Sequence, residues 1–567
     1  TADANKDVTA IRNLSATGDV TATGASVGAL ARGAIQTGNA SGVAAPLTKG
    51  AEGTVLTAGA NDLSWVEASG GGEQTFTASG AITAGDLVSL NTNGTISKSK
   101  SPIGPTSTFS SSDIRPACGS AYDSDTDRVI VAWVDDSSNV GKIAIGTVSD
   151  VDNSVSYGSV LDFESNLTVG NKNWIKVVYD PSTQRGLILC MNGSYDILVR
   201  TITVTGGSTN TATVGAAATL ETGSQTSFAG YKNGTGVDVM FCPTINKVVV
   251  VFARTDGRGR ACIIIPNAST DTVTFGTEVT VSTDLTFDFV SMDYDVVNNI
   301  VGFSYENLNN DGYFNCLTPN ADNTITVGSQ IEPEVGTISF TQCTYDPIGD
   351  RFIMVYLDAP LYFYYFVHVD SNRVMTELNT FNFPEADVTQ GQFRSIYDPT
   401  TATVYNFDSR GQVFLSTFGT DDITAYNSLT SSLLWSISAV YCTPTLISNG
   451  RVFLAIRDIS TTPFSGKSFV VGDLINTPIG LAAESISNGA AGKVTVAGGI
   501  NTHQSGLAGG TPYRAALQGA ARLVTIADSL PFVSSNTTLP VHAIAQSATT
   551  VYVTGFTPLI SIYFRRS

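Results

Sequence analysis

Val178–Cys190 reads VYDPSTQRGLILC, an aromatic residue followed by an Asp-centred turn and an apolar run, and this pattern recurs along the middle of the chain. An Asp side chain accepts hydrogen bonds in an Asx turn and Pro presets φ, so Tyr-Asp-Pro predicts a strand end and a tight turn. The apolar run predicts the second strand of a hairpin. The other copies are AYDSDTDRVIVAW at Ala121–Trp133, MFCPTINKVVVVF at Met240–Phe252, DYDVVNNIVGFSY at Asp293–Tyr305, TYDPIGDRFIMVY at Thr344–Tyr356, IYDPTTATVYNFD at Ile396–Asp408 and VYCTPTLISNGRVFLAI at Val440–Ile456.

The spacing of these copies predicts the architecture. The marker aromatics are Tyr122, Tyr179, Phe241, Tyr294, Tyr345, Tyr397 and Tyr441, at intervals of 57, 62, 53, 51, 52 and 44 residues. A period near fifty residues fits four strands with their connections. Such a unit cannot bury both faces alone, so neighbouring units must stack. We therefore expect an all-β chain with a β-propeller of about seven blades; six or eight blades, or a solenoid, are the alternatives.

The composition favours a strand-rich fold, and the net charge argues against nucleic acid and anionic membranes as partners. Only 14% of the residues are charged, 42% are hydrophobic, and glycine is abundant at 54 residues. The net charge of −19 argues against a broad basic surface for nucleic acid or an anionic membrane. No apolar run approaches the roughly 20 residues of a membrane span. The chain begins at Thr1 without a signal pattern, and we expect it to be processed or to be the ordered part of a longer protein.

Residue types that support catalysis or metal binding are sparse. The seven cysteines form no C-x-x-C pair, which indicates neither a zinc site nor a disulfide framework. Cys118, Cys242, Cys343 and Cys442 fall near the markers, where we expect buried thiols. The histidines, His368, His503 and His542, lie far apart in the sequence. We predict no catalytic residue, metal or cofactor, with a carboxylate pair for glycoside hydrolysis as an alternative.

Three segments are candidates for binding. Asp123–Asp127 alternates carboxylates as a calcium loop does, but lacks the later Gly and Glu, which favours a solvated turn. Arg258 and Arg260 form a basic turn on an acidic protein, which we interpret as a solvated loop, with contact to an acidic polysaccharide as the alternative. Leu361–Val367, LYFYYFV, places Tyr362 and Tyr364 on one face. We interpret it as a blade strand packed on both sides, and the alternative is an exposed aromatic edge on which sugar rings could stack.

The flanking segments carry a family resemblance. ADANKDVTAIRNLSATGDVTATG at 2–24 resembles the repeated stalk of phage tail-fibre and related virion proteins. PLTKGAEGTVLTAGANDLSWVEA at 46–68 resembles an attachment segment of the same class. QTFTASGAITAGDLVSLNTNGTIS at 74–97 looks like the start of a small β-domain of fibre and decoration proteins. GLAAESISNGAAGKVTVAGGI at 480–500 looks like its continuation, so the propeller is expected to be inserted in this domain.

The resemblance implies an organisation and a function. We expect an N-terminal oligomeric stalk over residues 1–71, the first half of the small domain over 72–105, the propeller over 106–465 and the second half over 466–567. It implies a homotrimeric, non-enzymatic tail fibre or spike of the virion, docked to other virion proteins through the N-terminal region. The propeller would attach to a host surface glycan or protein. The alternatives are a capsid or tail decoration protein without a receptor and, third, a polysaccharide-degrading tailspike.

Overall fold

The computed structural model describes residues 72–505 with gaps at 92, 100–103, 151, 168–173, 206–209, 223–235, 284–286, 308, 335–337, 359–360, 383–392, 399–402, 409–411, 418–431, 434–438, 461, 473–477 and 498–499. Outside this span it describes short strands between 20 and 67 and between 512 and 553, with residues 507 and 549. In these parts the chain forms strands and one 3-10 turn, η1 (Ser448–Gly450). None of the described segments is a helix long and apolar enough to cross a membrane.

Most strands belong to antiparallel sheets that follow one another along the chain. The first strands are β11 (Ile114–Asp123), β16 (Ile175–Asp180), β21 (Val237–Cys242), β26 (Asp288–Asp295), β30 (Ile338–Asp346), β34 (Phe393–Asp398) and β38 (Ala439–Leu446). The second strands are β12 (Arg128–Asp135), β17 (Arg185–Met191), β22 (Lys247–Ala253), β27 (Ile300–Glu306), β31 (Arg351–Asp358), β35 (Thr403–Asp408) and β39 (Val452–Asp458). The third strands are β13 (Val140–Val148), β18 (Ile197–Thr205), β23 (Gly259–Asn267), β28 (Gly312–Pro319), β32 (Leu361–Val369), β36 (Gln412–Thr417) and β40 (Gly466–Val471).

The fourth strands complete each sheet. They are β14 (Val155–Tyr157), β19 (Thr211–Val214), β24 (Thr272–Phe275), β29 (Ile325–Glu334), β33 (Met375–Asn382), β37 (Ser432–Leu433) and, in the last sheet, β10 (Ser107–Ser110). Three short strands also pair with a third strand: β15 (Leu161–Glu164), β20 (Ala218–Glu221) and β25 (Val279–Ser282). The last sheet therefore joins the beginning of this region to its end, in the order β10-β40-β39-β38. Its strand β40 lies beyond residue 465, where the sequence placed the end of the propeller.

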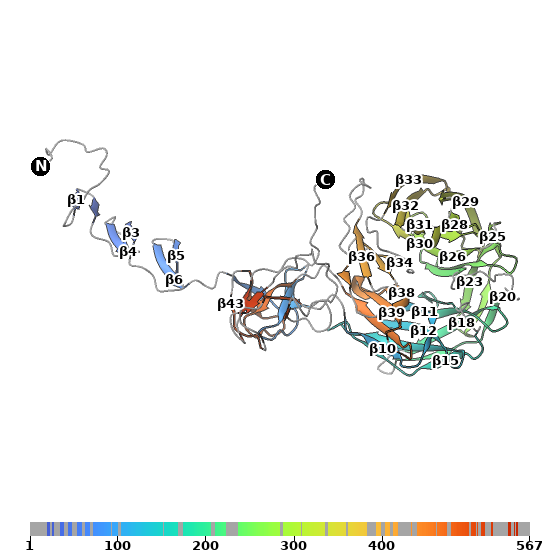
Figure 1. Ribbon diagram of the computed structural model, residues 1–567, viewed down its shortest axis with the longest axis horizontal. Helices are drawn as coiled ribbons and strands as arrows, with labels where there is room; N and C mark the ends of the chain where they lie inside the picture. The colour runs from blue at the N-terminus through green and yellow to red at the C-terminus, as the bar shows by residue number, and fades with distance from the viewer. Residues whose placement is uncertain are drawn as a thin grey trace.

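The sheets form a closed ring (Figure 1). Each first strand contacts the first strand of the next sheet, and β38 contacts β11. The second strands are buried along nearly their whole length, as in the β12 run Val129–Asp135, because each sheet is covered on both sides by its neighbours. This radial arrangement of antiparallel sheets is a β-propeller.

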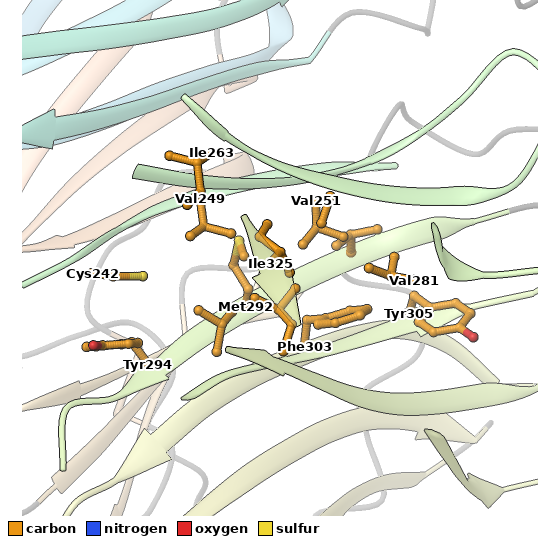
Figure 2. Close-up of a cluster of buried hydrophobic side chains, with 14 of the residues drawn as sticks. Cys242, Val249, Val251, Ile263, Val281, Met292, Tyr294, Phe303, Tyr305 and Ile325 are labelled. Atoms are coloured by element: carbon orange, nitrogen blue, oxygen red, sulfur yellow. The ribbon is translucent and has the colours of Figure 1, made fainter. Parts of the chain in front are cut away.

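Apolar cores fill the spaces between successive sheets. One core joins the sheets of β21 and β26 and contains Val249, Ile263, Met292 and Phe303 (Figure 2). The core between the last and first sheets contains Phe109, Trp133 and Val470. The six cysteines with described side chains are all buried, including Cys118, Cys242 and Cys343 of the prediction. The Cys442 side chain lies outside the described residues.

Strands on either side of the propeller pair with one another. The order β7-β42-β41-β8-β9 unites β7 (Glu73–Thr77), β8 (Leu87–Leu90) and β9 (Ile96–Lys98) with β41 (Pro478–Ala482) and β42 (Ala491–Thr495). We call this five-stranded sheet and the turns within it the clasp. A separate sheet contains β43 (Ile500–Asn501), β44 (Pro512–Ala515), β45 (Leu523–Thr525), β46 (Ala543–Ala545) and β47 (Val551–Val553).

The N-terminal region contains short hairpins within its described strands. They pair β1 (Val20–Ala22) with β2 (Ala25–Val27), β3 (Ile35–Gly38) with β4 (Ala44–Leu47), and β5 (Thr54–Ala58) with β6 (Leu63–Glu67). Figure 1 draws these hairpins in blue.

Candidate functional site

The turns between first and second strands, together with those between third and fourth strands, define one side of the ring, the marker-turn face. Asp123 accepts the backbone N–H groups of Asp125 at 3.0 Å and Thr126 at 3.1 Å. Asp346 accepts those of Ile348 and Gly349, each at 3.1 Å. These are the Asx turns that the sequence predicted.

The last copy of the marker is offset from the sequence alignment. Leu446 pairs with Val452 as Tyr122 pairs with Val129, so Leu446 and not Tyr441 occupies the marker position. In this copy the chain turns through η1, and Ile447 replaces the usual Asp. The corrected interval from Tyr397 is 49 residues, which is closer to those of the preceding copies.

Side chains on the marker-turn face form hydrogen bonds between neighbouring sheets. Tyr179 donates its hydroxyl to Asp125 of the preceding sheet at 2.6 Å. Arg128 donates to Asn210 of the following sheet at 2.8 Å, and Arg185 donates likewise to Asp271 at 2.7 Å.

A second kind of contact between neighbouring sheets recurs around the ring, in which a glycine packs closely against a turn residue of positive φ. Asn210, Asp271 and Asn323 have positive φ, and a Cβ at Gly158, Gly215 or Gly276 would overlap their respective carbonyl groups. The side chains and backbone of this face therefore hold the sheets together.

The Asp-rich turn belongs to this internal network. Asp123 is 2% exposed and also accepts the Thr126 hydroxyl, whereas Asp127 accepts the Tyr122 hydroxyl at 2.7 Å. Within the described residues, no group of three or more His, Cys, Asp or Glu side chains could hold a metal ion. The carboxylates are held by protein donors, and only Asp125 and Asp127 are exposed as expected for a solvated turn.

First strands form polar bonds from sheet to sheet around the inside of the ring. Lys176 Nζ lies 2.9 Å from Asp238 Oδ1, and Asp238 Oδ2 accepts the Met292 N–H at 2.9 Å. Asp293 accepts the Tyr345 N–H at 2.7 Å and the Thr344 hydroxyl at 3.1 Å. Burial raises the pKa of Asp293 to about 6, the hydrogen bonds partly oppose this, and the charge of Asp238 adds to it. These two carboxylates act as links between sheets.

The opposite side, which we call the far face, consists of the turns between second and third strands and the connections from one sheet to the next. Asn192 and Asn307 organise equivalent turns: Asn192 accepts the N–H groups of Ser194 and Asp196, each at 2.9 Å. Asn307 accepts those of Asn309 at 2.8 Å and Asp311 at 2.9 Å.

The basic turn that the sequence singled out is on the far face, and its two arginines differ. Arg258 is exposed, and its N–H donates to Asp256 at 3.0 Å. Arg260 is buried and pairs with Glu278 at 2.9 Å and with Thr280 at 2.6 Å. Arg260 is therefore a structural residue, and Arg258 remains the exposed candidate.

The aromatic segment does not form an exposed platform at Tyr364. Its strand β32 lies inside the sheet between β31 and β33, and Tyr364 is 1% exposed. Both faces of the sheet are covered by neighbours, so alternation cannot bring this ring to the surface. The side chain of Tyr362 lies outside the described residues.

Both chain connections of the propeller are on the marker-turn face. A third strand runs towards this face and a fourth strand runs away from it, so β40 ends there and β10 begins there. Consistently, Gly104 donates to Val470 O at 2.8 Å and packs against Asn153 of a marker-face turn. The far face thus carries no connection to the clasp.

Comparisons with known proteins found similar solved structures only. No protein-family model and no curated protein matches the chain. Among solved structures, it is similar to the Dos1 propeller, with 13% identity and a TM-score of 0.39, over 68% of this chain and 81% of that one. It is also similar to the Cps50 (Swd1) β-propeller domain of Myceliophteria thermophila, with 10% identity and a TM-score of 0.38, over 64% and 98%.

Proposed function

We propose that this chain is a non-enzymatic subunit of a bacteriophage tail fibre or spike, and that the far face of its propeller attaches the virion to a host surface. The resemblance of residues 2–24 and 46–68 to fibre stalk and attachment segments supports the class of particle. The observation that carries the attachment role is the placement of both chain connections on the marker-turn face. That placement leaves the far face accessible to a large partner.

The proposal includes a specific organisation. The propeller has seven blades, one for each marker copy, and interrupts a small β-domain whose halves pair in the clasp. The N-terminal region forms the trimeric stalk and binds other virion proteins. Trimerisation suits this role, because several weak contacts to a surface glycan or protein then combine in avidity.

The chemistry of the far face suits a hydrated partner. Its described turns present exposed Asp136, Ser194, Arg258 and Asn309, and few large apolar side chains. Small polar groups of this kind exchange hydrogen bonds with water for those of a glycan or a polar protein surface at low net cost.

The test is competition for adsorption with the full chain. Saturating protein should block phage adsorption to intact host cells. Ser194→Arg and Arg258→Glu, on the far face, should weaken this competition, while Asp322→Arg, on an exposed marker-face turn, should leave it unchanged. Equal loss in the Asp322 variant would refute the assignment of the face.

A decoration protein without a receptor is the second candidate. The resemblance of 74–97 and 480–500 to a module of decoration proteins favours it. Absence of binding to host cells, together with immunogold label over the capsid lattice instead of the tail tip, would establish this candidate in place of the first.

A further inference from the structure

The propeller is closed by a short strand. β10 has four residues and reaches β40 through Ser107↔Ser468, Thr108↔Lys467 and Ser110↔Gly466, with a register shift between Thr108 and Ser110. One large side chain anchors it: Phe109 is 4% exposed, and its ring lies 5.0 Å from that of Trp133 in the first sheet. A strand this short contributes little pairing energy of its own. The pairing of β10 with β40, which we call the seam, therefore depends on what holds the ends of these two strands.

The clasp is built from two similar halves that meet around a local two-fold axis. Ala78–Gly85 and Ala482–Gly489 share the pattern A-x-x-x-I-x-x-G. Ile82 and Ile486 exchange reciprocal backbone hydrogen bonds of 2.9 and 2.8 Å, and both side chains are 3% exposed in the clasp core.

Other backbone bonds between the two halves keep this symmetry. Ala78 N–H donates to Ala490 O at 2.8 Å, and Ala482 N–H donates to Asp86 O at 2.8 Å. Gly85 and Gly489 have φ of 88° and 76°, in the region that favours glycine. One half precedes the propeller and the other follows it, so the clasp forms only when the two ends of the ring come together.

Short connections couple the clasp to the seam. Ser99 still belongs to the clasp, where its N–H donates to Leu87 O at 2.7 Å, and Gly104 already donates to Val470. On the other side Gly472 and Pro478 bound the second connection. At about 3.5 Å per residue these connections reach no more than roughly 20 Å.

We propose that the clasp is the lock of the propeller: pairing between its halves holds β10 in the last sheet, and the ring opens at this seam when the halves separate. The other seams are crossed directly by the chain from one sheet to the next, whereas this seam is closed by strand pairing. The lock does not depend on what the far face binds, so the adsorption experiment and the experiment below can fail independently.

Hydrogen exchange of the full-length protein tests the lock. Ile82→Asp places a charge in the clasp core and should raise exchange in Ser107–Ser110 by about tenfold or more, while β27 in the opposite part of the ring stays protected. Leu90→Asp is the matched control, because Leu90 is in the same sheet but 47% exposed, and it should leave β10 unchanged. Ile486→Ala is the milder variant from the other half of the clasp. In this variant too, exchange should rise in the clasp and in β10 before it rises in β27.

Two results of the hydrogen-exchange experiment would contradict the proposal. If the clasp strands exchange freely in the Ile82 or Ile486 variant while β10 keeps wild-type protection, the seam is independent of the clasp and the proposal is wrong. Loss of protection in β27 together with β10 in Ile486→Ala would also overturn it, because the seam would then not be the first part of the ring to open.

Discussion

Gly302 occupies the middle of β27, in a run where a bulkier residue would be expected, and replacing it by alanine tests how tightly two sheets pack. A Cβ there would lie 2.6 Å from the ring of Phe352 in the next sheet and 2.8 Å from Phe314. Ordinary contact begins at 3.4 Å, so each ring would have to retreat by more than half an ångström. Phe352 is 1% exposed and has no room, because its ring already lies 4.9 Å from Tyr345 and 5.5 Å from Phe314.

Gly302→Ala should therefore lower the free energy of unfolding by about 2–3 kcal/mol, the upper part of the range for overpacked cores. The assay is equilibrium urea unfolding, with Val297→Ala, a 76% exposed residue in the preceding turn, as a control that should change little. Phe352→Leu should rescue the alanine variant, so that the double variant is more stable than additivity predicts by about 0.5 kcal/mol or more. Strict additivity, or a loss below about 0.5 kcal/mol for Gly302→Ala, would refute this account of the packing.

Three further predictions concern charges and thiols. Burial raises the folded-state pKa of Asp293 from 3.8 to about 6, so its contribution to stability is complete below pH 4 and is lost as pH rises through 6. The free energy of unfolding, measured with urea, should therefore fall by up to about 3 kcal/mol between pH 4 and 8, and this part of the pH dependence should disappear in Asp293→Asn. Arg260→Ala should cost about 1–3 kcal/mol by thermal or urea unfolding because it breaks buried bonds, whereas Arg258→Ala should stay within about 0.5 kcal/mol. Burial raises the pKa of the Cys190 and Cys262 thiols to about 12 and that of Cys343 as well, so a thiol reagent should label at most one cysteine, Cys442, in the native protein and all seven after denaturation.

The repeating hairpins could be predicted because their signals are local. Asp180 bonds residues two and three positions away, and Pro181 needs only its own ring to set φ. The last copy was misaligned because Ile447 has no side-chain acceptor and the chain turns by another route. Alternation alone could not choose between the two interpretations of Tyr364, since a strand covered on both sides has no solvent face, and the ring is buried as a packed strand requires.

The interactions that close the ring had no local signal. Thr108 and Lys467 are 359 residues apart, and the STFS segment of β10 is too short to show periodicity. Of the partners of Arg260, Thr280 lies on β25 and Glu278 immediately precedes this strand, whose pairing with β23 follows from the tertiary fold. Resemblance of the flanks predicted that the clasp halves belong together, but not that they are two copies of one pattern.

Because the two ends of the propeller leave on the same face, a pull on the far face is transmitted to the clasp through two covalent connections in parallel. Each connection carries part of the tension, and neither β10 nor β40 has to be peeled from its neighbour for the load to reach the clasp. Both strands are loaded from the same side of the ring, so the tension does not pull one strand past the other. If the ring attaches a particle as proposed, the load would therefore act along β10 and β40 and would not separate these two strands.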